Sequence, residues 1–160
     1  MNPFSARLVM QRMATLFPLG YEGQLPLFTQ KGGAVWVQQK YAMSQATFPA
    51  CHLEAGMQIH SRNSQRTHIA QLQVIISVYA RWDQQPQMID ALREDLDSDV
   101  ELLLAILQDN ENLAYGGQAM ATSIPRYSIS PYRGEIDETM VGLKAVYRTL
   151  TATVNVLPYD

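Results

Sequence analysis

Apolar residues recur at every second position between residues 72 and 80 of this chain. Between and beside Leu72, Val74, Ile76 and Val78 fall Gln71, Gln73, Ser77 and Tyr79, and Ile75 is the one aliphatic residue among the intervening positions. Successive side chains of a strand point to opposite faces of its sheet, so this period of two predicts a strand with one buried face. This strand is the element that the sequence predicts most clearly.

A helical period follows this strand directly. Asp83-Gln84-Gln85 indicates a turn, and Pro86 suits the opening of a helix. Apolar residues then recur at steps of three and four, which predicts a helix of about six turns with one apolar stripe. The stripe comprises Ile89, Leu92, Leu96, Val100, Leu103 and Leu107. A strand followed by such a helix is typical of a two-layer domain.

Before the alternating strand, the pattern predicts one helix and two short strands. Ser5 caps a helix that runs to about Phe17, where Pro18 and Gly20 end it. Residues 23–33 form a loop, and residues 34–37 and 49–54 form short strands. Residues 58–67 form an exposed hairpin tip or loop, because residues 61–66 include no apolar side chain.

After the long helix, residues 109–112 and 116–117 are turn material, and residues 119–129 form a strand. Pro125 interrupts that strand and cannot donate to a ladder, so the strand is at the edge of the sheet or bulged. Residues 130–137 form a loop, and residues 139–157 form a long terminal strand. The predicted fold class is α+β: a mainly antiparallel sheet covered on one face by the N-terminal helix and the long central helix.

Length and composition limit the class of protein. With 160 residues and 47% hydrophobic content, residues 1–160 are expected to form a single domain with its own core. A lone cysteine, Cys51, allows no intramolecular disulfide, and no Asn-x-Ser/Thr acceptor occurs, so the cytoplasm is the expected compartment. No apolar run approaches the roughly 18 residues of a membrane span, and no secretion signal opens the chain.

Metal-binding patterns are incomplete in this sequence. Asp95-x-Asp97-x-Asp99 resembles the start of a calcium loop, but Val100 and Ile106 occupy the positions that need glycine and a bidentate acid. The three histidines, His52, His60 and His68, are spaced by eight residues, without the close pairs that zinc sites use. We therefore expect no metal and no cofactor.

Catalytic patterns are equally unsupported. Cys51 and His52 are neighbours on a predicted strand and point to opposite faces, so a buried thiol is expected and not a nucleophile. No phosphate-binding glycine loop and no Gly-x-Ser-x-Gly elbow occurs. A sequence pI near 5.6 disfavours a dedicated nucleic-acid binder. These observations predict a protein that is not an enzyme.

Charge is distributed unevenly along the chain. Residues 24–82 carry a net charge of +4, and residues 83–113 carry −8. A basic segment and an acidic segment of one chain can pair between copies, because opposite potentials steer and align an interface. The simpler alternative is an acidic helix that only faces water. The candidate interface residues are Arg62, Arg66 and Arg81 on the basic side and Asp95, Asp99 and Glu101 on the acidic side.

Taken together, this element order resembles that of the tail terminator proteins of long-tailed bacteriophages, also called tail completion or tail-to-head joining proteins. The likeness covers roughly residues 5–157. It rests on the alternating strand that ends in Tyr79-Ala80-Arg81-Trp82, the acidic helix after Pro86, and the long final strand. The first helix, the strand at 49–54 and the exposed loop at 62–66 also fit. The loop at 20–33 and the Pro125 interruption depart from the family's layout.

The resemblance implies a structural role in the virion. Such a protein forms a homohexameric ring on the last tube ring of a tail, stops polymerisation, and offers its other face to the head connector or neck protein. DNA passes through the lumen without specific binding, and no membrane is involved. Assembly takes place in the host cytoplasm. The main alternative is another phage head–tail adaptor or minor tail component of similar fold, and an enzyme or a host regulatory module is a further one.

Overall fold

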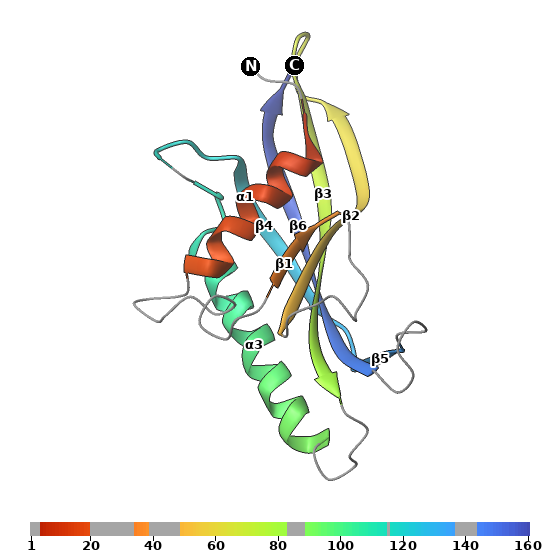
Figure 1. Cartoon of the computed structure of the whole chain (residues 1–160). Coiled ribbons are helices and arrows are strands. Elements are labelled where there is room, and N and C mark those ends of the chain that lie inside the picture. The colour runs from red at the N-terminus through yellow and green to blue at the C-terminus, as the bar shows by residue number, and fades with distance from the viewer. Residues whose placement is uncertain (1–3, 20–33, 39–48, 83–88, 115, 137–143) are drawn as a thin grey trace.

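The computed structural model describes residues 4–19, 34–38, 49–82, 89–114, 116–136 and 144–160. Within these ranges the chain has a mixed α+β fold with two helices and a six-stranded sheet, shown in Figure 1. The elements are α1 (Ala6–Leu19), β1 (Ala34–Val37), β2 (Ala50–Arg62), β3 (His68–Trp82), α3 (Ile89–Asp109), β4 (Ala121–Ile129), β5 (Arg133–Ile136) and β6 (Lys144–Tyr159).

The sheet is mostly antiparallel. Its strand order is β1-β2-β3-β6-β4, and β5 pairs with β6 off this path. Only the β1–β2 pair among the described strands is parallel. The two longest strands, β3 and β6, lie side by side at the centre and pair from His68↔Tyr159 to Trp82↔Lys144. The predicted fold class is confirmed at this level.

The alternating pattern of β3 places its apolar residues in the core, as predicted. Leu72, Val74, Ile76 and Val78 are fully buried. They form one hydrophobic cluster with residues from β2, β6 and both helices. The even-numbered residues of β6 join the same cluster through Leu150, Ala152 and Val154.

Both helices contribute an apolar stripe to this cluster. The backbone N–H of Leu8 donates to the Ser5 hydroxyl at 3.3 Å, which confirms the predicted cap of α1. Along α3, the predicted stripe is confirmed over its described side chains: four of its members are buried and Leu92 packs against the cluster. The four buried members are Leu96, Val100, Leu103 and Leu107.

Two sequence predictions were wrong in extent or type. The strand expected at 49–54 is the longer β2, which continues to Arg62, and the loop expected at 130–137 includes β5. By contrast, the prediction for the strand around Pro125 is confirmed: β4 is at the end of the strand order, with register shifts on either side of Ser123. The predicted segments 20–33, 83–86 and 139–143 lie outside the described residues.

A smaller cluster lies on the other side of the sheet. It comprises Trp36, Ala50, Tyr79 and Ala145, with Tyr147 packed against it. The rings of Tyr79 and Tyr147 face each other across paired strands with centroids 4.9 Å apart. In the part of the chain that the structure describes, no helix is both long and apolar enough to cross a membrane.

Candidate assembly interface

The hairpin between β2 and β3 carries two of the predicted basic residues. Arg62 ends β2 and Arg66 lies in the turn, and both side chains are exposed. Thr67 closes the turn, because its carbonyl accepts from the backbone N–H groups of Asn63 at 2.9 Å and Ser64 at 3.1 Å. The predicted exposed tip is therefore confirmed, at the end of a longer hairpin than the sequence indicated.

Arg81 does not join this basic tip. Arg62 pairs with His68, and Arg81 follows His68 by 13 positions on the same strand. At about 3.3 Å per residue, these 13 positions span about 43 Å. The three arginines therefore form no single basic face: two lie at the hairpin tip, and the exposed Arg81 lies toward the far end of β3.

The acidic residues of α3 divide into two groups. Asp95 and Glu101 are exposed, together with Asp90, Glu94 and Asp109. Asp99 is only 4% exposed, so its placement on an accessible acidic face was wrong. Its position four residues before the buried Leu103 and one before Val100 turns it toward the sheet side of the helix.

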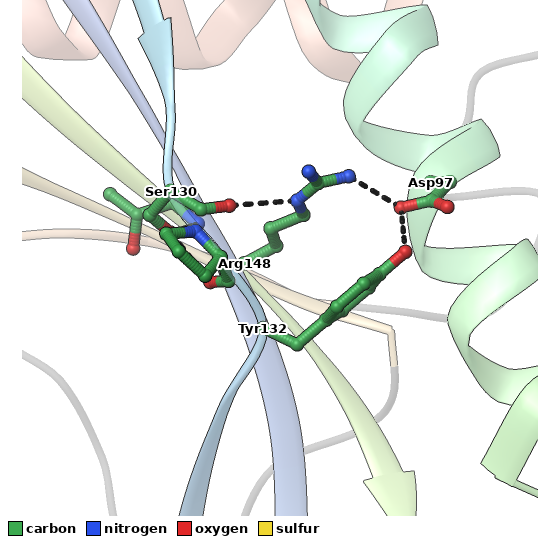
Figure 2. A network of polar contacts seen from close by, with 6 residues as sticks. Asp97, Ser130, Tyr132 and Arg148 are labelled. Atoms are coloured by element: carbon green, nitrogen blue, oxygen red, sulfur yellow. Dashed lines mark hydrogen bonds and ion pairs between the residues drawn. The ribbon is translucent and has the colours of Figure 1, made fainter.

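Asp97 is bound within the chain. The Nη1 group of Arg148 donates to Asp97 Oδ1 at 2.6 Å, and the Tyr132 hydroxyl donates to the same oxygen at 2.5 Å (Figure 2). The Arg148 Nε–H group donates to the carbonyl of Ser130 at 2.8 Å. These contacts tie α3 to β6 and to the segment between β4 and β5, so Asp97 serves the fold and is not free for a partner.

Two guanidinium groups lie close to the ring of Tyr132. The Cζ atom of Arg148 is 4.7 Å from the centre of its ring, and that of Arg93 is 5.1 Å away, within the range of cation–π attraction. The hydrogen bond to Asp97, burial and the charge of Asp97 raise the pKa of Tyr132, while the two arginines oppose this shift. The phenol therefore stays protonated as a donor to the carboxylate.

Sequence reasoning missed Arg148 and Tyr132. One signal was available for Arg148: it occupies an even position of β6, among the apolar residues Val146, Leu150 and Ala152 that pack in the core. A cation on such a face needs an acidic partner. Tyr132 carried no comparable signal, since it lies in a segment without periodicity.

The basic tip and the acidic helix are far apart within one chain. Arg148 pairs with Val78, and Val78 follows His68 by ten positions, so the contact with α3 lies about 33 Å along the strand from the level of the tip. In Figure 1 the hairpin projects at one end of the sheet, and α3 lies beside the other half. The opposite charges therefore cannot neutralise each other within the chain.

Aromatic side chains brace one face of the hairpin. The ring centroid of Phe4 is 4.9 Å from that of His60 and 5.3 Å from that of Tyr159. The Nδ1 atom of His60 is hydrogen-bonded to the Tyr159 hydroxyl, and His68 packs against the same tyrosine with centroids 5.8 Å apart. The two ends of the described chain are thus attached to the hairpin.

Cys51 and His52, which the sequence offered as candidates for catalysis or metal binding, are both buried within the fold. Cys51 is fully buried, as predicted, and burial raises the pKa of its thiol. His52 points to the opposite face, where its Nε2 atom lies 2.9 Å from the carbonyl oxygen of Gln38. Among the described residues, no group of three or more His, Cys, Asp or Glu side chains is arranged to hold a metal ion.

No model of a protein family matches the chain, and no curated protein matches it.

Proposed function

We propose that this chain is a structural phage protein of the tail terminator type, which forms a homohexameric ring on the end of the tail tube. In this role it stops polymerisation of the tube protein and presents its other face to the head connector or neck protein. The element order and the mostly antiparallel sheet support the proposal, because they match the layout that the resemblance predicted.

The observation that carries the proposal is the separation of charge within the chain. Arg62 and Arg66 are exposed at the hairpin tip, whereas Asp95 and Glu101 are exposed on α3. A surface of one sign that finds its complement only on another copy favours a heterologous, head-to-tail contact. Repetition of such a contact closes a ring when the rotation between copies allows it.

The proposal includes a two-layer subunit, in which α1 and α3 cover one face of the sheet. The single large cluster that joins both helices to alternate residues of β3 and β6 supports this arrangement. The second cluster around Trp36 and Tyr79 lies on the helix-free face. DNA passes through the lumen of the ring without specific binding, and the mature protein is located at the head-proximal end of the tail.

Electron microscopy of phage lysates tests the proposal. An early stop codon in this gene is expected to leave overlong or unjoined tails beside full heads. Tails of normal length beside unattached heads would instead establish the head–tail adaptor role. Normal, infectious particles would rule out both roles.

A further inference from the structure

The hairpin formed by residues 54–71, here called the arm, has a bare apolar face. Five large apolar side chains of the described residues are markedly exposed, and three of them are on the arm. Met57 is 62% exposed, Ile59 52% and Ile69 40%. Apolar groups gathered on an exposed surface and rimmed by polar residues mark sites of protein–protein contact.

A bulge puts these side chains on one face. Up to Ala55, the odd-numbered residues of β2 pair with the core-facing residues of β3, but the register shifts between Ala55 and Gln58. Beyond the shift, Gln58 pairs with Leu72, so the even-numbered residues take the core side. Met57, Ile59 and Ile69 therefore share the helix-free face of the sheet.

The two faces of the arm differ in what covers them. On the core side, His60 is packed by Phe4 and Tyr159. On the helix-free side, the side chains of Met57, Ile59 and Ile69 are exposed to solvent. The outer edge of β2 is open as well, since among the described strands β1 pairs with it only from Ala50 to Leu53. The arm thus projects beyond the domain with one apolar face unprotected.

An outward strip of α3 offers the complementary surface. Glu94, Ser98 and Glu101 are exposed at steps of four and three, and Leu102 and Ala105 adjoin them as half-buried apolar residues. The strip is therefore acidic at its start and apolar further along. The arm has the matching composition, with Arg62 and Arg66 at its tip and apolar residues along its length.

The two surfaces also match in length. The nine residues from Glu54 to Arg62 extend for about 30 Å as a strand. The 21 residues of α3 extend for about 31 Å as a helix. In the folded chain the arm projects at one end of the sheet and α3 lies beside the other half, so the arm can reach such a strip only on another molecule.

We propose that the arm docks on the outward strip of α3 of a second copy of this chain, with Met57, Ile59 and Ile69 against Leu102 and Ala105 and Arg66 of the turn against the helix carboxylates. This contact rests on the self-assembly put forward above and specifies its interface. The occupant is a second copy because the charges and lengths of the two surfaces fit each other.

Disulfide trapping between two single variants of the full chain tests the contact. Ile59→Cys and Ala105→Cys, one of them carrying a mass tag, are mixed and treated with diamide. A mixed disulfide between the two variants is expected. Cys51 is fully buried and does not compete. The matched control pairs Ile59→Cys with Thr15→Cys, an exposed position on α1 that is expected to give no mixed disulfide.

Sedimentation of serine variants gives a second measurement. The triple change Met57→Ser, Ile59→Ser and Ile69→Ser is expected to weaken self-association by about tenfold or more, because the buried apolar contact is lost. Leu8→Ser, which removes a leucine 52% exposed on α1, is expected to leave association unchanged. Both variants should keep the unfolding temperature of the unmodified chain, since the altered side chains are exposed.

The outcomes separate this contact from the phage role. If the mixed disulfide forms but an early stop codon in the gene leaves normal phage particles, the contact is supported and the tail function is rejected. Overlong tails without any mixed disulfide would reject the contact and keep the function. Equal trapping in the control pair, unchanged association of the triple variant, or a chain that binds only a different virion protein would overturn the contact.

Discussion

Arg148 and Asp97 form an ion pair with a nitrogen–oxygen distance of 2.6 Å, and this pair connects β6 to α3. The side chains are 27% and 37% exposed, so water screens the pair in part. We expect Asp97→Ala and Arg148→Met each to lower the free energy of unfolding by about 1 kcal/mol, with a coupling of about 0.5–1 kcal/mol in a double-mutant cycle. Urea unfolding measures all three values.

Salt provides the control for this cycle. Screening in 1 M NaCl should reduce the coupling without abolishing it, because the Tyr132 hydroxyl also bonds to Asp97 and excludes some water. A coupling free energy of zero at low salt would show that the ion pair does not contribute to the stability of the fold.

Reactivity of Cys51 reports on the integrity of the core. The thiol is fully buried and burial raises its pKa, so both access and thiolate content are low in the folded chain. Labelling by Ellman's reagent at pH 8 is expected to be negligible in buffer and complete in denaturing urea. Rapid labelling of the folded chain would mean that β2 opens on the time scale of the reaction.

Alkaline pH should destabilise the chain through Tyr127. Its hydroxyl donates to Glu111 at 3.2 Å, and burial together with the Glu111 charge raises its pKa above the ordinary value near 10. The unfolded chain then loses this proton first, so the stabilisation is present below about pH 10 and is lost as the pH rises toward the folded-state pKa. Tyr127→Phe is expected to flatten the fall in unfolding free energy between about pH 9.5 and pH 11.

Tyr132 gives the matched comparison, since its pKa is raised in the same direction. Replacement of both tyrosines by phenylalanine should flatten the pH dependence more than either change alone. An unchanged slope in the double variant would assign the alkaline loss of stability to other groups.

Charge reversal at the hairpin tip should weaken assembly. Arg62→Glu with Arg66→Glu replaces two positive charges by two negative ones, which the proposed contact would bring near the acidic helix of another copy, so self-association is expected to fall by about tenfold or more at low salt. Reversal of Glu94, Asp95 and Glu101 to lysine in the same chain should restore it. Sedimentation at two salt concentrations measures both effects.

Arg81→Glu is the comparison for this experiment, because Arg81 lies about 43 Å along β3 from the tip. We expect it to affect association less than the tip reversal does. Unchanged assembly of the tip variant would remove the electrostatic account of the interface.

The sequence predicted best those elements whose core-facing residues recur with a regular period. The even positions of β3 and the stripe of α3 are buried as expected, because each pattern persists over many residues. The edge position of β4 followed from Pro125 alone. Such predictions depend on local chemistry and need no knowledge of tertiary contacts.

The arm escaped prediction for a physical reason. Beyond Leu53 almost all side chains on both faces of β2 are exposed. The sequence from Glu54 to Arg62 therefore has no alternation of apolar and polar residues that would predict a strand. The exposure of the acidic residues of α3 was predicted only in part, because the contacts of Asp97 and the burial of Asp99 depend on β6 and the sheet, which are distant in sequence.

The two margins of the sheet are protected unequally. At the β4 margin, Pro125 and two register shifts interrupt the regular spacing that another strand would need. At the β2 margin, the edge beyond Leu53 is unpaired by any described strand and carries no proline. An isolated chain therefore has one sheet edge that can pair with a strand of another molecule. We expect concentrated solutions of the unassembled chain to aggregate through this β2 edge. Ile59→Lys would place a charge on the sheet face beside that edge, and we expect it to keep concentrated preparations dispersed during storage.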